Sequence, residues 1–125
     1  MPDASSAGPP DRVGTARLIQ AHGLRPDKDL GQNFLLDENL ADLAVREGRV
    51  EDADVVLELG PGVGTLTAAI ARRARHVHAI EIDRRLEPAL ADSLAAFPNV
   101  QVHWGDVMKL DLSALHPAPT RLVGN

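Results

Sequence analysis

The sequence has no cysteine and no tyrosine, and aromatic residues make up only 2% of its 125 positions. Without cysteine there is no disulfide framework, no thiolate metal site and no cysteine nucleophile. No apolar run approaches the roughly 18 residues of a membrane span. Residues 1–10 also lack the basic start and apolar stretch of a secretory signal. These absences predict a folded protein of the cytoplasm that does not associate with membranes.

Positive charge is also scarce, and the formal net charge is −5. This balance disfavours binding to nucleic acid by charge alone, because that interaction needs clustered lysine and arginine. The deficit is local, since residues 36–71 carry two basic and eight acidic side chains. We interpret the main basic concentration as a solvated helix face; it consists of Arg72, Arg73, Arg75, Arg84 and Arg85.

The first 54 residues lack the pattern of a sheet. Residues 1–11 are rich in proline, serine, alanine and glycine, which predicts a disordered tail. Residues 12–54 are predicted to be a helical segment. It contains one helix over 12–23 and a second that runs from the N-cap Asp37 to Gly48.

Apolar runs alternate with helical spacing from residue 55 onward. The run "VVLEL" (55–59) is almost continuously apolar, as expected of a strand buried on both faces of a parallel sheet. Further strands are predicted over 77–82, 100–104 and 121–125, with helices over 63–75 and along Leu86, Leu90 and Leu94. Strands that alternate with helices indicate an α/β fold with an open parallel sheet over residues 55–125.

Three glycines, Gly60, Gly62 and Gly64, follow the first strand directly. A ligand can approach the peptide N–H groups of such a turn without meeting a Cβ atom, beyond the carboxyl ends of the strands. The dinucleotide fingerprint G-x-G-x-x-G is not met, because its sixth position is occupied by Thr65 or Thr67. The turn therefore favours a nucleoside with an amino-acid tail, with a nicotinamide-dependent oxidoreductase as an alternative.

Carboxylates follow the next two predicted strands. Glu81 lies near the end of "HAIEID", where it can accept hydrogen bonds from ribose hydroxyls, and Asp83 is the alternative. Asp106 follows "VQVHW" and can accept from an adenine amine, although an aspartate there is also typical of a turn. Together with the glycine turn, these carboxylates predict a pocket for S-adenosylmethionine.

The histidines and the single tryptophan indicate no separate site. His76 and His78 share a strand face, but no further ligands follow at a recognisable spacing, so we predict no metal. All five histidines are interpreted as ordinary surface or strand residues, and Trp104 as a core residue.

Two sequence blocks in fixed order carry a family resemblance. The block "LGQNFL" (30–35) precedes "ELGPGVGTLT" (58–67), and "EID", "GD" and a strand ending in "GN" follow. Over about residues 28–125 the chain resembles the ribosomal RNA adenine N6-dimethyltransferases of the KsgA group. The related Erm methyltransferases of large-subunit rRNA share the layout and remain an alternative. The "GPG" turn and "GQNFL" are more similar to the KsgA group.

The resemblance implies a fold, a cofactor and a substrate. The fold is the Rossmann-like class I methyltransferase fold, and the methyl donor is S-adenosylmethionine. The substrate is a pair of adjacent adenosines near the 3′ end of small-subunit rRNA, within the immature small ribosomal subunit, and the enzyme is a monomer. The implied cofactor-binding residues are Asn33, Leu35, Gly60, Gly62, Glu81, Asp106 and Asn125.

Asn125 has a further implied role, because it is also the implied catalytic residue. In the family, an asparagine at the end of the fourth strand accepts a hydrogen bond from the target amine. Phe34 is expected to anchor its segment on the sheet. The family motif continues with Leu-Pro-aromatic and a C-terminal helical domain, so we expect a fragment truncated after the fourth strand that transfers no methyl group alone. A non-catalytic module for ribosome assembly or RNA binding is the remaining alternative.

Overall fold

The computed structural model describes residues 14–30, 32, 34–35 and 37–124, and within them it contains one parallel sheet. The strand order is β3-β2-β1-β4, and every neighbouring pair is parallel, as predicted. The strands are β1 (Val55–Leu59), β2 (His76–Glu81), β3 (Val100–Trp104) and β4 (Arg121–Gly124). The helices are α1 (Gly14–Ala21), α2 (Glu38–Glu47), α3 (Thr65–Ala71) and α4 (Glu87–Ser93), with short 3₁₀ helices η1 (Lys28–Leu30), η2 (Arg84–Leu86) and η3 (Leu112–Ala114).

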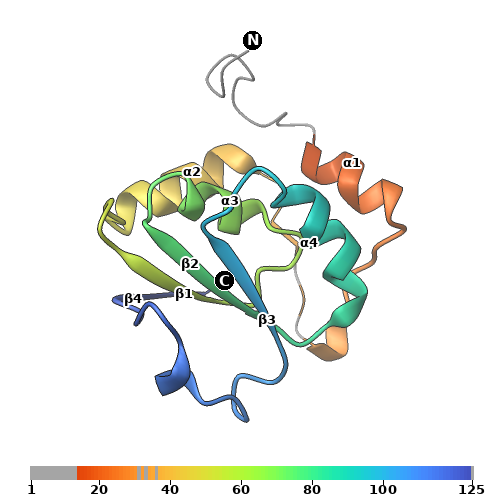
Figure 1. Cartoon of the computed structure of the whole chain (residues 1–125). Coiled ribbons are helices and arrows are strands. Elements are labelled where there is room, and N and C mark those ends of the chain that lie inside the picture. The colour runs from red at the N-terminus through yellow and green to blue at the C-terminus, as the bar shows by residue number, and fades with distance from the viewer. Residues whose placement is uncertain (1–13, 31, 33, 36, 125) are drawn as a thin grey trace.

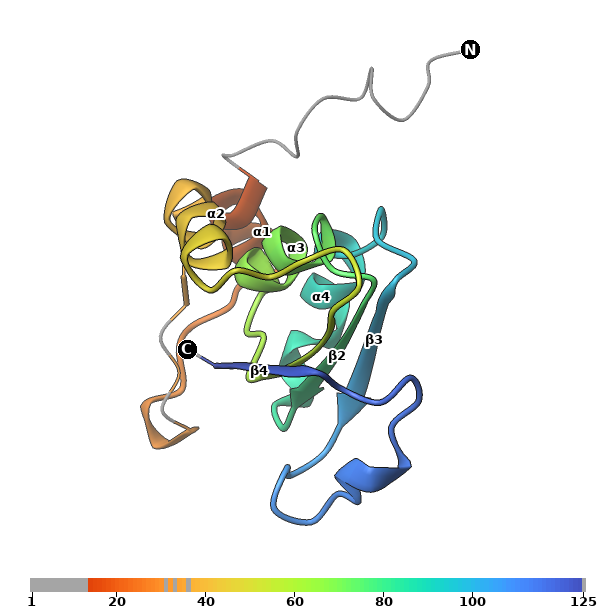
Figure 2. The same ribbon diagram turned by 90° about the vertical axis from the view of Figure 1, so that its left-hand side faces the viewer.

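The four α-helices cover one face of the sheet (Figure 1). Two successive crossovers in the same direction, β1-α3-β2 and β2-α4-β3, place α3 and α4 together on that face. The other face carries the long connection from β3 to β4, which includes η3 (Figure 2). Because β4 lies on the opposite side of β1 from β2, the strand order reverses at β1. A reversal of this kind is where open α/β sheets bind their ligands.

The helices of the N-terminal segment pack against the helices that follow β1 and β2. Helix α1 contacts α4, and helix α2 contacts α3. Asp37 accepts hydrogen bonds from the backbone N–H groups of Asn39 and Leu40, which confirms it as the N-cap of α2. The predicted tail over 1–11 lies outside the described residues. No helix in the described part of the chain has the length and apolar character needed to span a bilayer.

The core lies between the sheet and the helices. Val56, Ile70 and Val77 are completely buried there, and each contributes about 1.5–3 kcal/mol of burial free energy. A second cluster around Leu86 and Leu90 extends under α4 and includes Trp104 as a partly buried member. Trp104 therefore packs against the core but is not fully buried in it, so the prediction of a core residue holds only in part.

Hydrogen bonds accepted by Asp54 anchor the start of β4 to the start of β1. The carboxylate of Asp54 accepts from Nε of Arg121 at 2.6 Å and from the hydroxyl of Thr120 at 3.0 Å. Thr120 also bonds the backbone of Val55, through its N–H at 2.7 Å and its hydroxyl. A hydrogen bond from the backbone N–H of Glu51 lowers the pKa of Asp54, and the bonds from Arg121 and Thr120 lower it further. This network fixes where β4 begins.

Two histidines, His78 and His103, form a hydrogen-bonded cluster that the sequence did not predict. They lie on the face of the sheet that is opposite the helices. His78 is completely buried, and its Nε2 lies 2.8 Å from the carbonyl oxygen of Pro117. A carbonyl only accepts, so His78 Nε2 donates, and in the neutral ring Nδ1 accepts from Nε2 of His103 at 2.9 Å. Burial lowers the pKa of His103, with a further contribution from His78. The cluster ties the connection from β3 to β4 onto the sheet.

Gly64 departs from the predicted role of the glycine turn. Its φ is +92°, and a Cβ atom at this position would lie 2.5 Å from Oγ of Ser93 and 3.3 Å from a methyl group of Leu90. These atoms belong to α4, so the missing side chain allows α3 and α4 to pack and does not open a path for a ligand. The sequence-based interpretation of the third glycine was therefore wrong.

We predict that Gly64→Ala lowers the free energy of unfolding by about 2–4 kcal/mol, from backbone strain at positive φ and from overpacking. Urea denaturation of the purified chain measures the change. The double variant Gly64→Ala/Ser93→Ala relieves the contact with Oγ and should recover part of the loss. An unchanged stability for Gly64→Ala would contradict the packing role.

Candidate functional site

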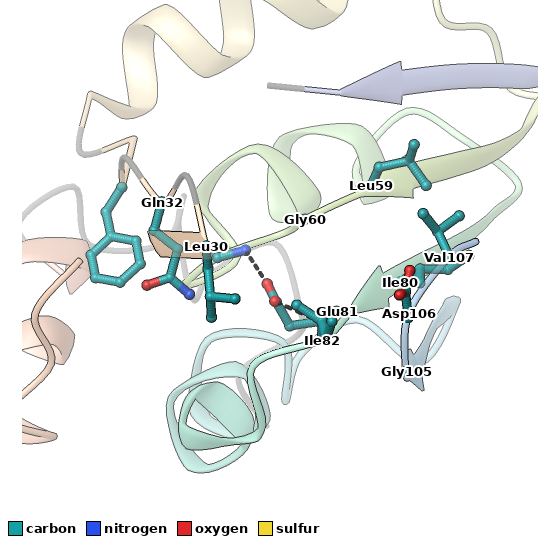
Figure 3. Close-up of a pocket in the computed structure, with 12 residues that line it drawn as sticks. Leu30, Gln32, Leu59, Gly60, Ile80, Glu81, Ile82, Gly105, Asp106 and Val107 are labelled. Carbon is teal, nitrogen blue, oxygen red and sulfur yellow. Dashed lines mark hydrogen bonds between the residues drawn. The ribbon is translucent and has the colours of Figure 1, made fainter. Parts of the chain in front are cut away.

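A cleft of about 230 Å³ lies at the carboxyl ends of β1, β2 and β3. We call it the strand-end cleft. Its wall combines backbone from the glycine turn with side chains from the ends of β2 and β3 and from the segment after η1. The lining residues are Leu30, Gln32, Phe34, Leu59, Gly60, Gly62, Ile80, Glu81, Ile82, Gly105, Asp106 and Val107. Figure 3 shows Glu81 between Leu30 and Gln32 on one side and the turn Gly105–Val107 on the other.

The glycine turn gives the cleft an open floor. Gly60 has a φ of +69°, and no atom lies within 4 Å of the position that a Cβ would take. Its N–H donates to the carbonyl of Ile80 at 2.9 Å, and the N–H of Gly62 donates to Glu81 at 3.2 Å. Both N–H groups therefore already have acceptors within the chain, and the approach of a ligand to these two glycines stays a prediction. The turn offers a ligand room at Gly60.

Glu81 is held by three backbone N–H groups. Its Oε1 accepts from Gly62, and its Oε2 accepts from Ile82 at 2.9 Å and from Asp83 at 3.0 Å. The residue is only 5% exposed although it lines the cleft. A carboxylate has about four acceptor positions, so these bonds leave about one, on Oε1, for a ligand hydroxyl.

Asp83, the alternative carboxylate at the end of this strand, does not line the strand-end cleft. Its oxygens accept from Arg85 at 2.6 Å and from Gln32 at 2.8 Å. The hydrogen bond from Arg85, supported by that from Gln32, lowers the pKa of Asp83 to about 2. This arrangement favours Glu81 over Asp83 as the carboxylate that meets a ligand in the cleft.

Asp106 makes a turn interaction and also lines the cleft, while its role toward an adenine amine stays a prediction. Its Oδ1 accepts from the N–H of Met108 at 2.9 Å, which is a turn interaction. The same residue lines the strand-end cleft, on the opposite side from Gln32 (Figure 3). A carboxylate in a turn of this kind keeps further acceptor positions for a ligand amine.

The segment after η1 contributes two side chains to the cleft. Gln32 and Phe34 line it, and a Cβ at Gly62 would lie 3.5 Å from Cδ1 of Phe34. Phe34 also packs against the core cluster under α4, which confirms its predicted anchoring role. Leu35 does not line the cleft, since its side chain packs against the core cluster that includes residues of α2, and its contact with a ligand stays a prediction. Asn33 and Asn125 lie outside the described residues.

Glu58 is a buried carboxyl for which sequence reasoning gave no role beyond its place ahead of the glycines. It is 2% exposed, and its Oε1 accepts from the hydroxyl of Thr67 at 2.5 Å. The pKa of Glu58 is raised to about 7, mainly by burial; the hydrogen bond from Thr67 opposes this shift, and the charge of Glu81 adds to it. The signal in the sequence was an acidic residue inside an otherwise apolar buried strand.

Comparison with known families adds to this geometry. Residues 23–123 match the family model "Ribosomal RNA adenine dimethylase". This range includes all the residues that line the strand-end cleft. The chain belongs to this family. The match agrees with the resemblance carried by the sequence blocks and with the parallel α/β sheet.

Individual proteins to which the chain is similar are also rRNA or adenosine methyltransferases. The chain is 45% identical over 124 residues to the ribosomal RNA small subunit methyltransferase A of Deinococcus radiodurans, which covers 99% of this chain and 41% of that relative. Among solved structures, the 23S rRNA methyltransferase ErmE is 36% identical with a TM-score of 0.63, over 74% of this chain and 36% of that one. A dimethyladenosine transferase from Plasmodium falciparum is 26% identical with a TM-score of 0.59, over 70% and 31%.

No group of three or more histidine, cysteine, aspartate or glutamate side chains among the described residues is arranged to hold a metal ion.

We predict that Glu58→Gln changes how stability depends on pH. Relative to the reference value of 4.5, the raised pKa means that the folded chain binds a proton between pH 4.5 and about 7 that the unfolded chain does not. This contribution to stability is therefore gained as the pH falls through that window and is lost above it. Glutamine keeps the acceptor for Thr67 without titrating.

Relative to the unaltered chain, Glu58→Gln should gain up to about 3 kcal/mol between pH 5 and pH 8. Urea denaturation at several pH values measures the difference, with the exposed Glu47→Gln as the matched control. A difference that stays constant with pH would contradict the assignment of the buried carboxyl.

Proposed function

We propose that this chain binds S-adenosylmethionine in the strand-end cleft, as part of an enzyme that methylates N6 of two adjacent adenosines near the 3′ end of small-subunit rRNA. One observation carries the proposal. Gly60, Glu81 and Asp106 lie at the carboxyl ends of β1, β2 and β3 and line one cleft, in a chain that belongs to the ribosomal RNA adenine dimethylase family. No other arrangement in the described residues combines a glycine turn with two cleft carboxylates.

The residues of the cleft fit such a donor. The open space at Gly60 accommodates the methionine part next to the turn. The remaining acceptor position on Oε1 of Glu81 suits a ribose hydroxyl, and Asp106 suits the exocyclic amine of adenine. The apolar side chains of Leu30, Phe34 and Ile82 line the cleft alongside these groups and suit the faces of the base and sugar. The carboxylates also favour a ligand that carries positive charge.

When bound, S-adenosylmethionine supplies an electrophilic methyl group on its sulfonium. The task of the protein is then alignment, because a positioned pair of reactants can remove about 7–11 kcal/mol of the barrier. The exocyclic nitrogen of adenine is a poor nucleophile, since its lone pair is conjugated into the ring. We assign Asn125 to accept a hydrogen bond from that amine, which frees the lone pair.

The choice between rRNA substrates rests on the relatives. The chain is 45% identical to the small subunit methyltransferase A of Deinococcus radiodurans over 99% of its length. It is 36% identical to the 23S rRNA methyltransferase ErmE over 74%. The higher identity over the longer match supports a small-subunit target, and an Erm-type large-subunit target is the second candidate. The immature small subunit as partner, the monomeric state and the cytoplasmic location stay predictions.

We predict that the purified chain binds S-adenosylmethionine in isothermal titration calorimetry and does not bind NAD. Glu81→Gln should weaken donor binding about tenfold to a hundredfold, because it exchanges a charged acceptor for an amide. Glu87→Gln, on the exposed surface of α4, is the matched control and should bind as the unaltered chain does. Binding of NAD without the methyl donor would instead support the oxidoreductase alternative.

Methyl transfer is tested with a chimera, because the chain covers 41% of the Deinococcus radiodurans relative. We predict that residues 1–125 joined to the remaining C-terminal part of that relative methylate unmodified small ribosomal subunits with radiolabelled donor. The 125-residue chain alone and the Asn125→Ala chimera should transfer no label. Labelling of large subunits would support the Erm alternative. Capture of small subunits by an inactive chimera, independent of donor, would support the non-catalytic alternative.

A further inference from the structure

We propose that Asp83 is a positioning residue of the strand-end cleft. Its side chain holds Gln32 at the cleft wall and fixes the backbone N–H groups that orient Glu81. The inference deepens the proposed donor binding and rests on it. It gives a role to a carboxylate that lies beside the cleft without lining it.

The side chain of Asp83 is buried and bonded on both oxygens. It is 6% exposed, and Arg85 approaches it with Nε at 3.0 and 3.1 Å and with a terminal nitrogen at 2.6 Å. Nε2 of Gln32 donates to Oδ2 at 2.8 Å. A carboxylate with such donors keeps one geometry, because every bond is charge-assisted.

Gln32 is held from its other end as well. Its Oε1 accepts from the N–H of Asp27 at 2.8 Å, and its own N–H donates to the carbonyl of Asp27 at 3.0 Å. The amide of Gln32 therefore bridges the turn at Asp27 and the carboxylate of Asp83. This bridge fixes the wall of the cleft that faces Glu81 (Figure 3).

Asp83 also acts on Glu81 through the backbone. Its Oδ1 accepts from the N–H of Arg85 at 3.1 Å and so caps η2, which fixes the conformation of the chain at residues 82–83. The N–H groups of Ile82 and Asp83 then point at Oε2 of Glu81. With Oε2 held there, Oε1 faces Gly62 and the cleft. The orientation of the Glu81 carboxylate thus depends on the cap that Asp83 makes on η2.

Removal of the Asp83 carboxylate would leave several donors without their acceptor. The guanidinium of Arg85 is 52% exposed and can turn to water. The side-chain amide of Gln32 is partly buried, and within the described residues it would lose the acceptor of its Nε2. The bond from Arg85 keeps the pKa of Asp83 near 2, so the contact is ionised throughout neutral pH. A change at Asp83 should therefore appear at the cleft, more than in global stability.

The sharpest test replaces the donor amide of Gln32 by a second acid. In Gln32→Glu, an ionised oxygen would face Oδ2 of Asp83 at the position of the present 2.8 Å bond. We expect S-adenosylmethionine binding, measured by calorimetry relative to the unaltered chain at each pH, to be weakened at least about tenfold at pH 8. It should return to within about twofold at pH 5, because the new carboxyl protonates and donates to Asp83. Asp83 and the nearby Asp27 favour the protonated form of that carboxyl, whereas Arg85, with a terminal nitrogen 3.4 Å from Oε1 of Gln32, favours the ionised form.

Two further variants separate positioning from a general loss of structure. Asp83→Asn should weaken donor binding and should be non-additive with Gln32→Ala, since both remove the same contact. Arg84→Ala is the matched control, because Arg84 pairs with the exposed Glu87 next to the same turn. In the ligand-free chain, the amide proton resonance of Gly62 should shift in Asp83→Asn and stay in place in Arg84→Ala.

The outcomes distinguish this inference from the proposed function. If the unaltered chain does not bind S-adenosylmethionine, the proposed function fails and the inference fails with it. If the unaltered chain binds but the Gln32 and Asp83 variants bind equally well, or if the loss in Gln32→Glu is the same at pH 5 and pH 8, only the positioning role is overturned. A pH-dependent loss together with the shifted Gly62 resonance supports it.

Discussion

The parallel register of β1, β2 and β3 is the constraint on which the candidate site depends. Leu59 pairs with Ile80, and Glu81 pairs with Trp104, so the three strands end at nearly the same level. The residues that follow each strand are then forced to one edge of the sheet. Residues more than twenty positions apart in the sequence meet there only because the strands run in the same direction. The burial of β1 on both faces holds this register in place.

Much of this arrangement could be predicted from local patterns. The apolar run of β1 and the alternation of strands with helices predicted the parallel sheet. The carboxylates at strand ends predicted two residues that line the cleft, Glu81 and Asp106. The position of Asp37 gave the start of α2. Each of these signals is contained in a few consecutive residues, so no knowledge of distant contacts is needed to interpret it. The boundaries of the elements differed by a few residues, because helix and strand ends depend on their caps.

The parts that could not be predicted depend on contacts between distant positions. Gln32 and Asp83 are separated by 51 residues, and Asp54 and Arg121 by 67. The third glycine looked like part of a ligand loop until Ser93 and α4 were in place beside it. In the same way, His78 and His103 carried no spacing signal for the hydrogen bond that joins them, or for the bond from His78 to the carbonyl of Pro117. Tertiary packing assigned a role to each of these residues that its neighbours in sequence did not suggest.

The anchor between Asp54 and Arg121 also sets a length requirement on β4. Strand residues advance about 3.3 Å each, and their side chains alternate between the two faces of the sheet. The bond between Asp54 and Arg121 therefore fixes the position and the face of each later residue of β4. An inserted or deleted residue between Arg121 and Gly124 would exchange the exposed Leu122 with the inward Val123 and displace everything that follows by one step. Substitutions that keep the alternation of exposed and inward side chains leave each residue of β4 at its position, whereas a change in length does not. Homologous sequences can therefore vary in composition along β4 far more freely than in the number of its residues.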